Sequence, residues 1–206
     1  HLELLGWRRQ PLVPPGAGAA VAWLEQWVPP QGAGGTWQAA PFELQELEHG
    51  RIWLRSPDSN PWGTTHGLAV ADGEGQPRPL LSRRYPQPWP ACPTPPHHCE
   101  PAPAGPPLTV DGTVLAVADL SAEIHYHWLL DSLPRLGLAL ALARSGAGAD
   151  SGWPEHWHLW HNGGGSERVR RSLVDDLGIP PERLIDAHQH PDLKAKRLLI
   201  PPPLHP

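Results

Sequence analysis

The chain has 206 residues and a net charge of −5 at pH 7, with a sequence pI near 6.2. Neutralising phosphates requires clustered Lys and Arg, so this acidic balance argues against a nucleic-acid partner. No apolar run approaches the ~20 residues of a membrane-spanning helix, and two cysteines are too few for a disulfide framework. We therefore expect a cytoplasmic protein. Because the chain starts at His1, contains no Met and stops after Pro206, we also expect both ends to be truncated.

The first 107 residues show no sustained hydrophobic period and are rich in Pro and Trp. Short strands are expected at Arg51–Leu54 and His66–Val70, which are separated by turn residues. The four-residue spacing of Trp23 and Trp27 predicts a short helix over residues 19–27. We interpret residues 1–107 as an irregular arm that carries short strands.

The pattern changes at Leu108, from where strand and helix signals alternate to the end of the chain. A continuous apolar run at Thr113–Ala118 is typical of a buried strand. The signals that follow predict a helix at 124–144, a strand at 156–160, a helix at 166–177, and strands at 183–186 and 197–201. Gly178, with two prolines just beyond it, marks the end of the second helix. Residues 108–206 are therefore expected to form a Rossmann-like parallel α/β layer.

The first of these helices carries the chemistry. Glu123, His127, Asp131 and Arg135 recur every four residues and would share one polar stripe on an α-helix. Leucines at 129, 130, 133 and 136 would cover the other faces, which predicts a buried helix whose polar stripe meets a cleft or is paired internally. Pro134 should interrupt the helix near Leu130, because proline cannot donate the backbone hydrogen bond.

Two interpretations of this stripe are possible from the residues alone. In the first, Asp131 and Arg135 form an ordinary ion pair at four-residue spacing, and His127 is a core histidine. In the second, Asp131 or His127 is a general base in a cleft at the strand ends, where open α/β sheets bind ligands.

The run His127-Trp128-Leu129-Leu130-Asp131-Ser132-Leu133-Pro134-Arg135-Leu136 resembles the signature of glycosyltransferase family 61. The segments Leu177–Pro180 and Lys196–Pro201 also resemble that family in order and spacing, so the resemblance covers roughly residues 114–201. Bacterial members usually carry Asn two places before the motif His, where this chain has His125.

The resemblance implies the amino-terminal half of a GT-B enzyme, which transfers a sugar from a nucleotide-sugar donor to an acceptor hydroxyl with inversion and without a metal or other cofactor. In polysaccharide or glycan synthesis of this kind, this half would face the glycan acceptor, and an absent carboxy-terminal half would hold most of the donor. On this basis Asp131 or His127 is the base, Arg135 orients the Asp131 carboxylate, and His125 and Trp128 lie on the acceptor side or support the site. Residues 1–206 alone are then expected to be inactive.

Two other classes of function stay open. The chain could be a non-catalytic α/β module that binds a saccharide or a protein, or a small metalloprotein. For the second, the candidate ligands are Cys92, His97, His98 and Cys99, but their spacing matches no common zinc finger, so we expect no metal site. The run Gly163–Gly165 lacks the ordered spacing and the Lys of phosphate-binding loops, which favours a plain loop.

Overall fold

The structure of the protein is a computed structural model that describes residues 8–11, 25–28, 43–55, 63–84, 102–147 and 153–202. Its strands are β1 (Arg8–Pro11), β2 (Glu25–Val28), β3 (Gln45–Glu48), β4 (Arg51–Leu54), β5 (Gly67–Ala71), β6 (Arg83–Arg84), β7 (Leu108–Ala116), β8 (Trp157–His161), β9 (Leu184–Asp186) and β10 (Asp192–Ile200). The helical segments are α1 (His125–His127), a π-helical turn (Trp128–Ser132), α2 (Leu133–Ala147), α3 (Glu167–Arg171), a second π-helical turn (Ser172–Asp176) and a 3-10 turn (Pro181–Arg183).

An eight-stranded mixed sheet organises the described residues. Its parallel part has the order β9-β8-β7-β10, which confirms the α/β class and the parallel layer expected after residue 107. On the other side of β10, the sheet continues through β4, β5 and β6 with antiparallel pairing, and β3 also pairs antiparallel with β10. Residues 43–84, predicted to belong to a separate arm, thus contribute strands to the same sheet as residues 108–202.

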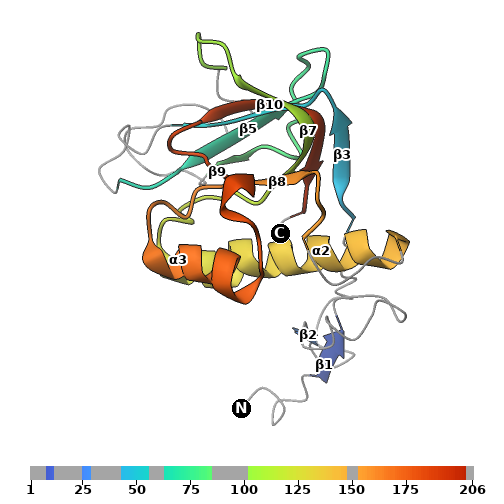
Figure 1. Cartoon of the computed structure of the whole chain (residues 1–206). Coiled ribbons are helices and arrows are strands. Elements are labelled where there is room, and N and C mark those ends of the chain that lie inside the picture. Colours follow the sequence, from blue (N-terminus) through green and yellow to red (C-terminus); the bar gives the residue numbers. More distant parts are fainter. Residues whose placement is uncertain are drawn as a thin grey trace.

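The sheet curls until its two ends share one hydrophobic core (Figure 1). Leu68 and Val70 from β5 pack in the same buried cluster as Trp160 from β8 and Ile185 from β9, although these strands lie near opposite ends of the sheet. The pairing of β10 with β7 shifts register between Ala195 and Arg197, and an irregularity of this kind bends a strand and increases its twist. Because the sheet curls, residues 187–191 are enough to connect the end of β9 with the start of β10.

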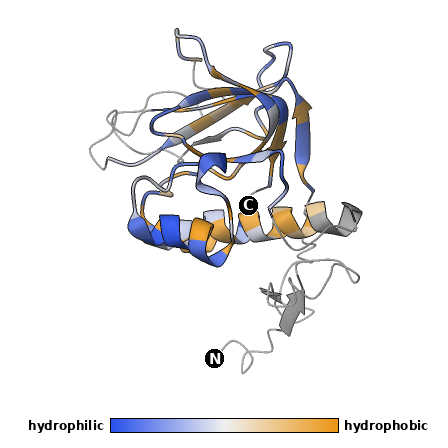
Figure 2. Cartoon of the chain, viewed as in Figure 1, coloured by the Kyte–Doolittle hydropathy of each residue, from blue (hydrophilic) through white to orange (hydrophobic). Residues whose placement is uncertain are grey.

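The helices cover the outer face of the parallel strands (Figure 1). Leu136, Ala139 and Leu140 of α2 pack with Leu115 of β7 and Leu159 of β8 in a second buried cluster. Figure 2 shows α2 coloured mainly as hydrophobic, whereas the visible side of α3 is largely hydrophilic. Burying each large side chain of this kind stabilises the fold by about 1.5–3 kcal/mol. Within the ranges given above, no helix is both long and apolar enough to cross a membrane.

The helix after β7 differs from the predicted one in two ways. Glu123 precedes the helix, and the π-helical turn adds a residue between His127 and Arg135, since the backbone N–H of Leu133 bonds to the carbonyl of Trp128. The four residues therefore do not share the stripe of an uninterrupted α-helix. The expected interruption near Leu130 takes the form of this widened turn, which precedes Pro134.

The start of this helix is also less buried than the sequence predicts. Leu129 and Leu130 are 43% and 46% exposed, and Tyr126 is 64% exposed. Full burial begins with Trp128 on one side and continues along α2 with Leu136 and Leu138. The expectation that leucines bury the faces beside the polar stripe was thus wrong for Leu129 and Leu130.

The other predicted elements after residue 107 are confirmed with shifts of a few residues, the largest being a five-residue earlier start for both β7 and β10. The helix predicted over residues 19–27 was wrong at its end, because Glu25–Trp27 belong to β2, which pairs antiparallel with β1. Residues 19–24 lie outside the described residues, as do Cys92, His97, His98 and Cys99.

Candidate functional site

Polar side chains follow each of three neighbouring parallel strands and meet at their carboxyl ends. Asp119 and Glu123 follow β7, Asn162 comes directly after β8, and His188 comes two residues after β9. A fifth side chain, that of Thr65, reaches the same place from the segment before β5. Open α/β sheets bind their ligands outside this edge of the strands. The carboxyl edge of these strands is therefore the candidate functional site.

Asn162 is fully buried and holds the cluster together. Its Oδ1 accepts a hydrogen bond from the backbone N–H of Asp119 at 3.0 Å. Its Nδ2 donates to the Asp119 carbonyl at 2.7 Å and to Oγ1 of Thr65 at 2.9 Å, with a longer contact of 3.3 Å to Oε1 of Glu123. One amide thus fixes the loop after β7 against the end of β8, and it holds the Glu123 carboxylate in place.

Glu123 and His188 form a carboxylate–imidazole pair. Nε2 of His188 lies 3.2 Å from Oε1 of Glu123 and 3.2 Å from the carbonyl oxygen of Asn162. Both neighbours only accept hydrogen bonds, so Nε2 must carry the proton. Glu123 Oε1 also accepts from the backbone N–H of Thr65 at 3.0 Å and from the Thr65 hydroxyl.

These contacts shift the pKa values of both partners in opposite directions. Burial raises the pKa of Glu123, but hydrogen bonds from His188 and Thr65 outweigh it, so the net pKa is lowered. The hydrogen bond to Glu123 raises the pKa of His188 above its ordinary value, against a smaller opposing effect of burial. Both shifts favour the charged form of the pair, in which a Glu123 carboxylate faces a His188 imidazolium. Oε2 of Glu123 is buried and has no hydrogen-bond partner among the described residues.

His127 and Asp131 form a second carboxylate–imidazole pair, within the predicted motif. Nδ1 of His127 lies 2.8 Å from Oδ2 of Asp131, across the π-helical turn. The two side chains are 31% and 24% exposed, so solvent or a ligand can reach them. Because this contact uses Nδ1, the other ring nitrogen of His127, Nε2, takes no part in the pairing with Asp131.

Arg135 lies inside the protein. It is 1% exposed, and its guanidinium donates to Oδ2 of Asp119 at 2.7 Å and to the carbonyl oxygens of Pro201 at 2.7 Å and Pro202 at 3.1 Å. The predicted role of Arg135, orienting the Asp131 carboxylate, stays a prediction. What its contacts do is join α2 to the loop after β7 and to the segment after β10.

The remaining predicted residues, His125 and Trp128, differ in burial. Trp128 is fully buried, its Nε1 donates to Oγ of Ser172 at 3.0 Å, and its ring meets that of His161 edge-on at 6.0 Å. Trp128 thus packs the helix against the α3 segment. His125 is exposed at the start of α1.

Sequence analysis missed the roles of Asn162, His188 and Thr65, and it placed Glu123 on a helix. A usable signal was present for the first two, because each follows a predicted strand within two residues. Thr65 carries no such signal, since its approach depends on the curl of the sheet. Groups of three or more side chains that could hold a metal ion are absent from the described residues.

Comparisons of this chain with protein-family models, with curated proteins and with solved structures find no match.

Proposed function

We propose that this chain is the acceptor-facing half of a cytoplasmic, inverting glycosyltransferase of the GT-B type, which acts in polysaccharide or glycan synthesis. One observation carries the proposal: the His127–Asp131 pair of the motif lies partly exposed at the start of the helix that follows β7, next to the carboxyl edge of the parallel strands. The sequence of the motif is the reason to choose sugar transfer among the reactions that need a base.

The proposed reaction asks one thing of this half. The acceptor hydroxyl oxygen forms a bond to the anomeric carbon of the donor sugar, and the bond from that carbon to the donor phosphate oxygen breaks. The nucleotide leaves with that electron pair, and the hydroxyl proton passes to a base. An imidazole held by a carboxylate suits this task, because the carboxylate fixes the ring and stabilises the imidazolium that forms.

Two imidazoles in the described part of the chain have this arrangement. His127 is held through Nδ1 by Asp131, which leaves Nε2 for the acceptor. His188 is held through Nε2 by Glu123, which leaves Nδ1. We place the base at His127 with Asp131, because the His127 ring is more exposed than that of His188, at 31% against 24%. Its carboxylate partner Asp131 is likewise more exposed than Glu123, at 24% against 17%. The Glu123–His188 pair then supports the site by fixing the loops after β7 and β9.

The test uses the protein translated from the complete coding frame that contains these 206 residues. Transfer from nucleotide-sugar donors is measured for the parent, His127→Gln and Asp131→Asn, with the exposed His156→Gln as the matched control. We expect kcat to fall by about 10²–10⁴-fold for the first two, the usual contribution of a general base, and to change little for the control. Transfer rates close to the parent's in both His127→Gln and Asp131→Asn would exclude these two residues as the catalytic base.

The same protein preparation distinguishes the proposed transferase from the main alternative, a non-catalytic binding module. A non-catalytic module would bind saccharide or protein with no transfer in the complete protein. Residues 1–206 by themselves are expected to show no transfer, because the donor-binding half is not included. Turnover by this chain alone would contradict the proposal.

A further inference from the structure

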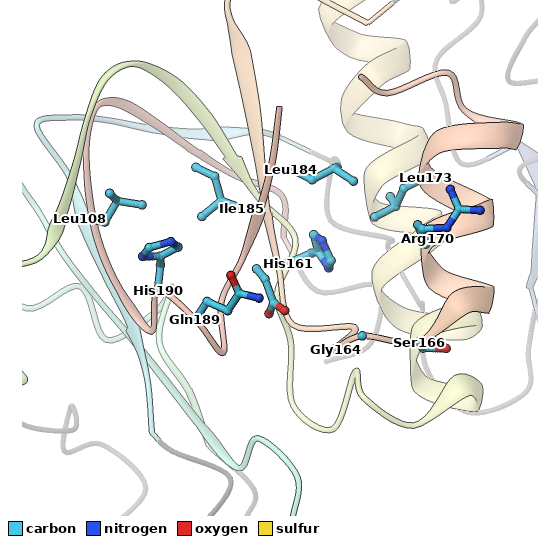
Figure 3. A pocket seen from close by; sticks show the side chains of 12 residues that line it. Leu108, His161, Gly164, Ser166, Arg170, Leu173, Leu184, Ile185, Gln189 and His190 are labelled. Atoms are coloured by element: carbon cyan, nitrogen blue, oxygen red, sulfur yellow. The ribbon is translucent and has the colours of Figure 1, made fainter. Parts of the chain in front are cut away.

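A cavity of about 380 Å³ lies beside the edge strand β9 and is distinct from both acid–base pairs (Figure 3). Its walls combine an apolar side, with Leu108 and Ile185, and a polar side, with Asp186, Gln189 and His190. The backbone of Gly164 and Gly165 closes one end. The volume is in the range of small-molecule sites, and a mainly apolar wall with a few polar groups is the usual composition of such sites.

The glycine run at the end of this cavity is explained only in part by the fold. A Cβ on Gly163 would lie 2.5 Å from Cγ1 of Val169, so this glycine lets α3 approach β8 closely. Gly164 has a φ of 62°, which favours glycine. Gly165 has neither constraint: its φ is outside the left-handed region, and a Cβ there would meet nothing within 4 Å. Gly165 is exposed and lines the cavity, so a ligand there can approach its backbone closely.

Asp186 supplies a carboxylate to the lining of the cavity. It is the last residue of β9 and half-buried. Its Oδ1 accepts from the backbone N–H of His188 at 2.9 Å, whereas none of the hydrogen bonds within the described residues engages Oδ2. An ionised carboxylate with one fixed and one available oxygen is an acceptor for hydroxyl groups of a ligand.

The order of these parts along the chain is similar to that of a nucleoside-binding unit, but the run Gly163–Gly165 lacks the glycine spacing of that unit. Strand β8 leads through the glycine turn into α3, and then into β9, which ends in an acid about 20 residues after the turn. In sheets built this way, the acid binds ribose hydroxyls and the glycine turn allows the phosphate side of the ligand to approach the backbone.

We propose that this cavity binds a ribonucleoside. Asp186 accepts hydrogen bonds from the vicinal ribose hydroxyls, the base packs against Leu108 and Ile185, and the 5′ side points towards Gly164 and Gly165. The proposal does not depend on sugar transfer, since it concerns binding by the described chain itself. It also differs from the expected donor site, which the family resemblance places in a following half.

The test is a calorimetric titration of the 206-residue chain with uridine, adenosine, their 2′-deoxy analogues, uridine 5′-monophosphate and methyl glucoside. We expect at least one ribonucleoside to bind, and its 2′-deoxy analogue to bind at least tenfold more weakly. Equal affinity for the two would overturn the proposal, as would no binding at several millimolar. Tighter binding of methyl glucoside would overturn it as well, because it would assign the cavity to saccharides. Comparison with the monophosphate shows whether the ligand includes a phosphate; the free nucleoside decides the proposal.

Two variants locate the site. Asp186→Asn keeps the shape but removes the charge, and we expect affinity to fall at least tenfold; the exposed Asp111→Asn is its control. Gly165→Val fills the open space and should abolish binding, whereas Gly105→Val, where a Cβ also meets nothing within 4 Å, should not. Thermal unfolding of each variant verifies folding. If Asp186→Asn fails to fold, the proposal is still tested by Gly165→Val and by the comparison of each ribonucleoside with its 2′-deoxy analogue. Full binding by a folded Gly165→Val would contradict the proposal.

Discussion

Arg135 and Asp119 form an ion pair in the interior, with Nη1 of the guanidinium 2.7 Å from Oδ2 of the carboxylate and side chains that are 2% and 11% exposed. The same guanidinium binds the carbonyl oxygens of Pro201 and Pro202, which follow β10. A single side chain of the motif helix thus connects the carboxyl ends of β7 and β10. The motif Arg is therefore tied to the architecture of the sheet as well as to any chemistry at Asp131.

Removing this guanidinium should destabilise the protein strongly. In Arg135→Met the Asp119 carboxylate keeps its burial but loses this partner, and breaking a buried ion pair on one side typically costs about 3–5 kcal/mol. Arg135→Lys should recover only part of the loss, because an ammonium lacks the planar fork that reaches three acceptors. Urea unfolding of the chain measures both. Arg197→Gln, which removes an exposed ion pair with Glu46, serves as control and should cost under about 1 kcal/mol. Equal stability of Arg135→Met and the parent would show that this pair does not hold the edge together.

Gly163→Ala should lower stability through one contact. The new Cβ would lie 2.5 Å from Cγ1 of Val169, and a β-branched side chain cannot swing aside, so α3 must move. Overpacking of this kind typically costs about 1–3 kcal/mol. The double variant with Val169→Ala should show a favourable coupling, and Gly105→Ala should be neutral. Strict additivity of the two changes would argue that the close approach of α3 and β8 is not what requires glycine.

Acid should destabilise the protein through His161 before it affects the carboxylates. Burial lowers the pKa of His161 from 6.5 to about 4, so the folded protein resists a proton that the unfolded chain accepts. Stability is full above pH 6.5 and falls as the pH drops towards 4, by roughly 3 kcal/mol in total. The free energy of unfolding, measured at pH 7, 6, 5 and 4.5, should show this slope in the parent. In His161→Gln the slope in this window should become shallower, with a remainder from His158, whose pKa burial also lowers. An unchanged slope would assign the effect to another group.

The proton positions at His188 give a direct test of the Glu123–His188 pair. In histidine-labelled protein, ¹⁵N–¹³C NMR should detect the Nε2–H tautomer and a pKa above 6.5, because the hydrogen bond to Glu123 favours the charged ring. In Glu123→Gln the pKa should fall, since an amide cannot stabilise the imidazolium in this way. The stabilisation from this raised pKa is fully present below pH 6.5 and is lost as the pH rises through the folded-state value. Observation of the Nδ1–H tautomer would rule out the hydrogen bonds described here.

The sequence carried enough information to predict the elements after residue 107. Buried strands and helices can be recognised from short-range hydrophobic patterns. The end of the second predicted helix can be recognised because Gly178 has a φ of 65°, which favours glycine. Predictions from sequence patterns were wrong where the backbone departed from a regular α-helix or where tertiary packing decided which residues are buried. The π-helical turn before Pro134 broke the four-residue spacing that had linked Glu123 to Arg135. Leu129 and Leu130 appeared to be core residues because hydropathy does not say which part of a helix reaches the sheet.

The candidate site was only half predictable for the same reason. His127 and Asp131 lie one turn apart on one element, so their spacing alone brings them together. Glu123 meets His188 only because parallel pairing places the ends of β7, β8 and β9 side by side. Thr65 joins them only because the antiparallel strands curl over the sheet.

The amino-acid order by itself thus determined the strands, the helices and the pair within the motif helix, because each depends on neighbours a few residues away. Tertiary structure decided which strands pair, that residues 43–84 enter the same sheet, and which side chains Glu123 and Arg135 meet. Those outcomes depend on how distant apolar faces are buried together, which no local pattern encodes.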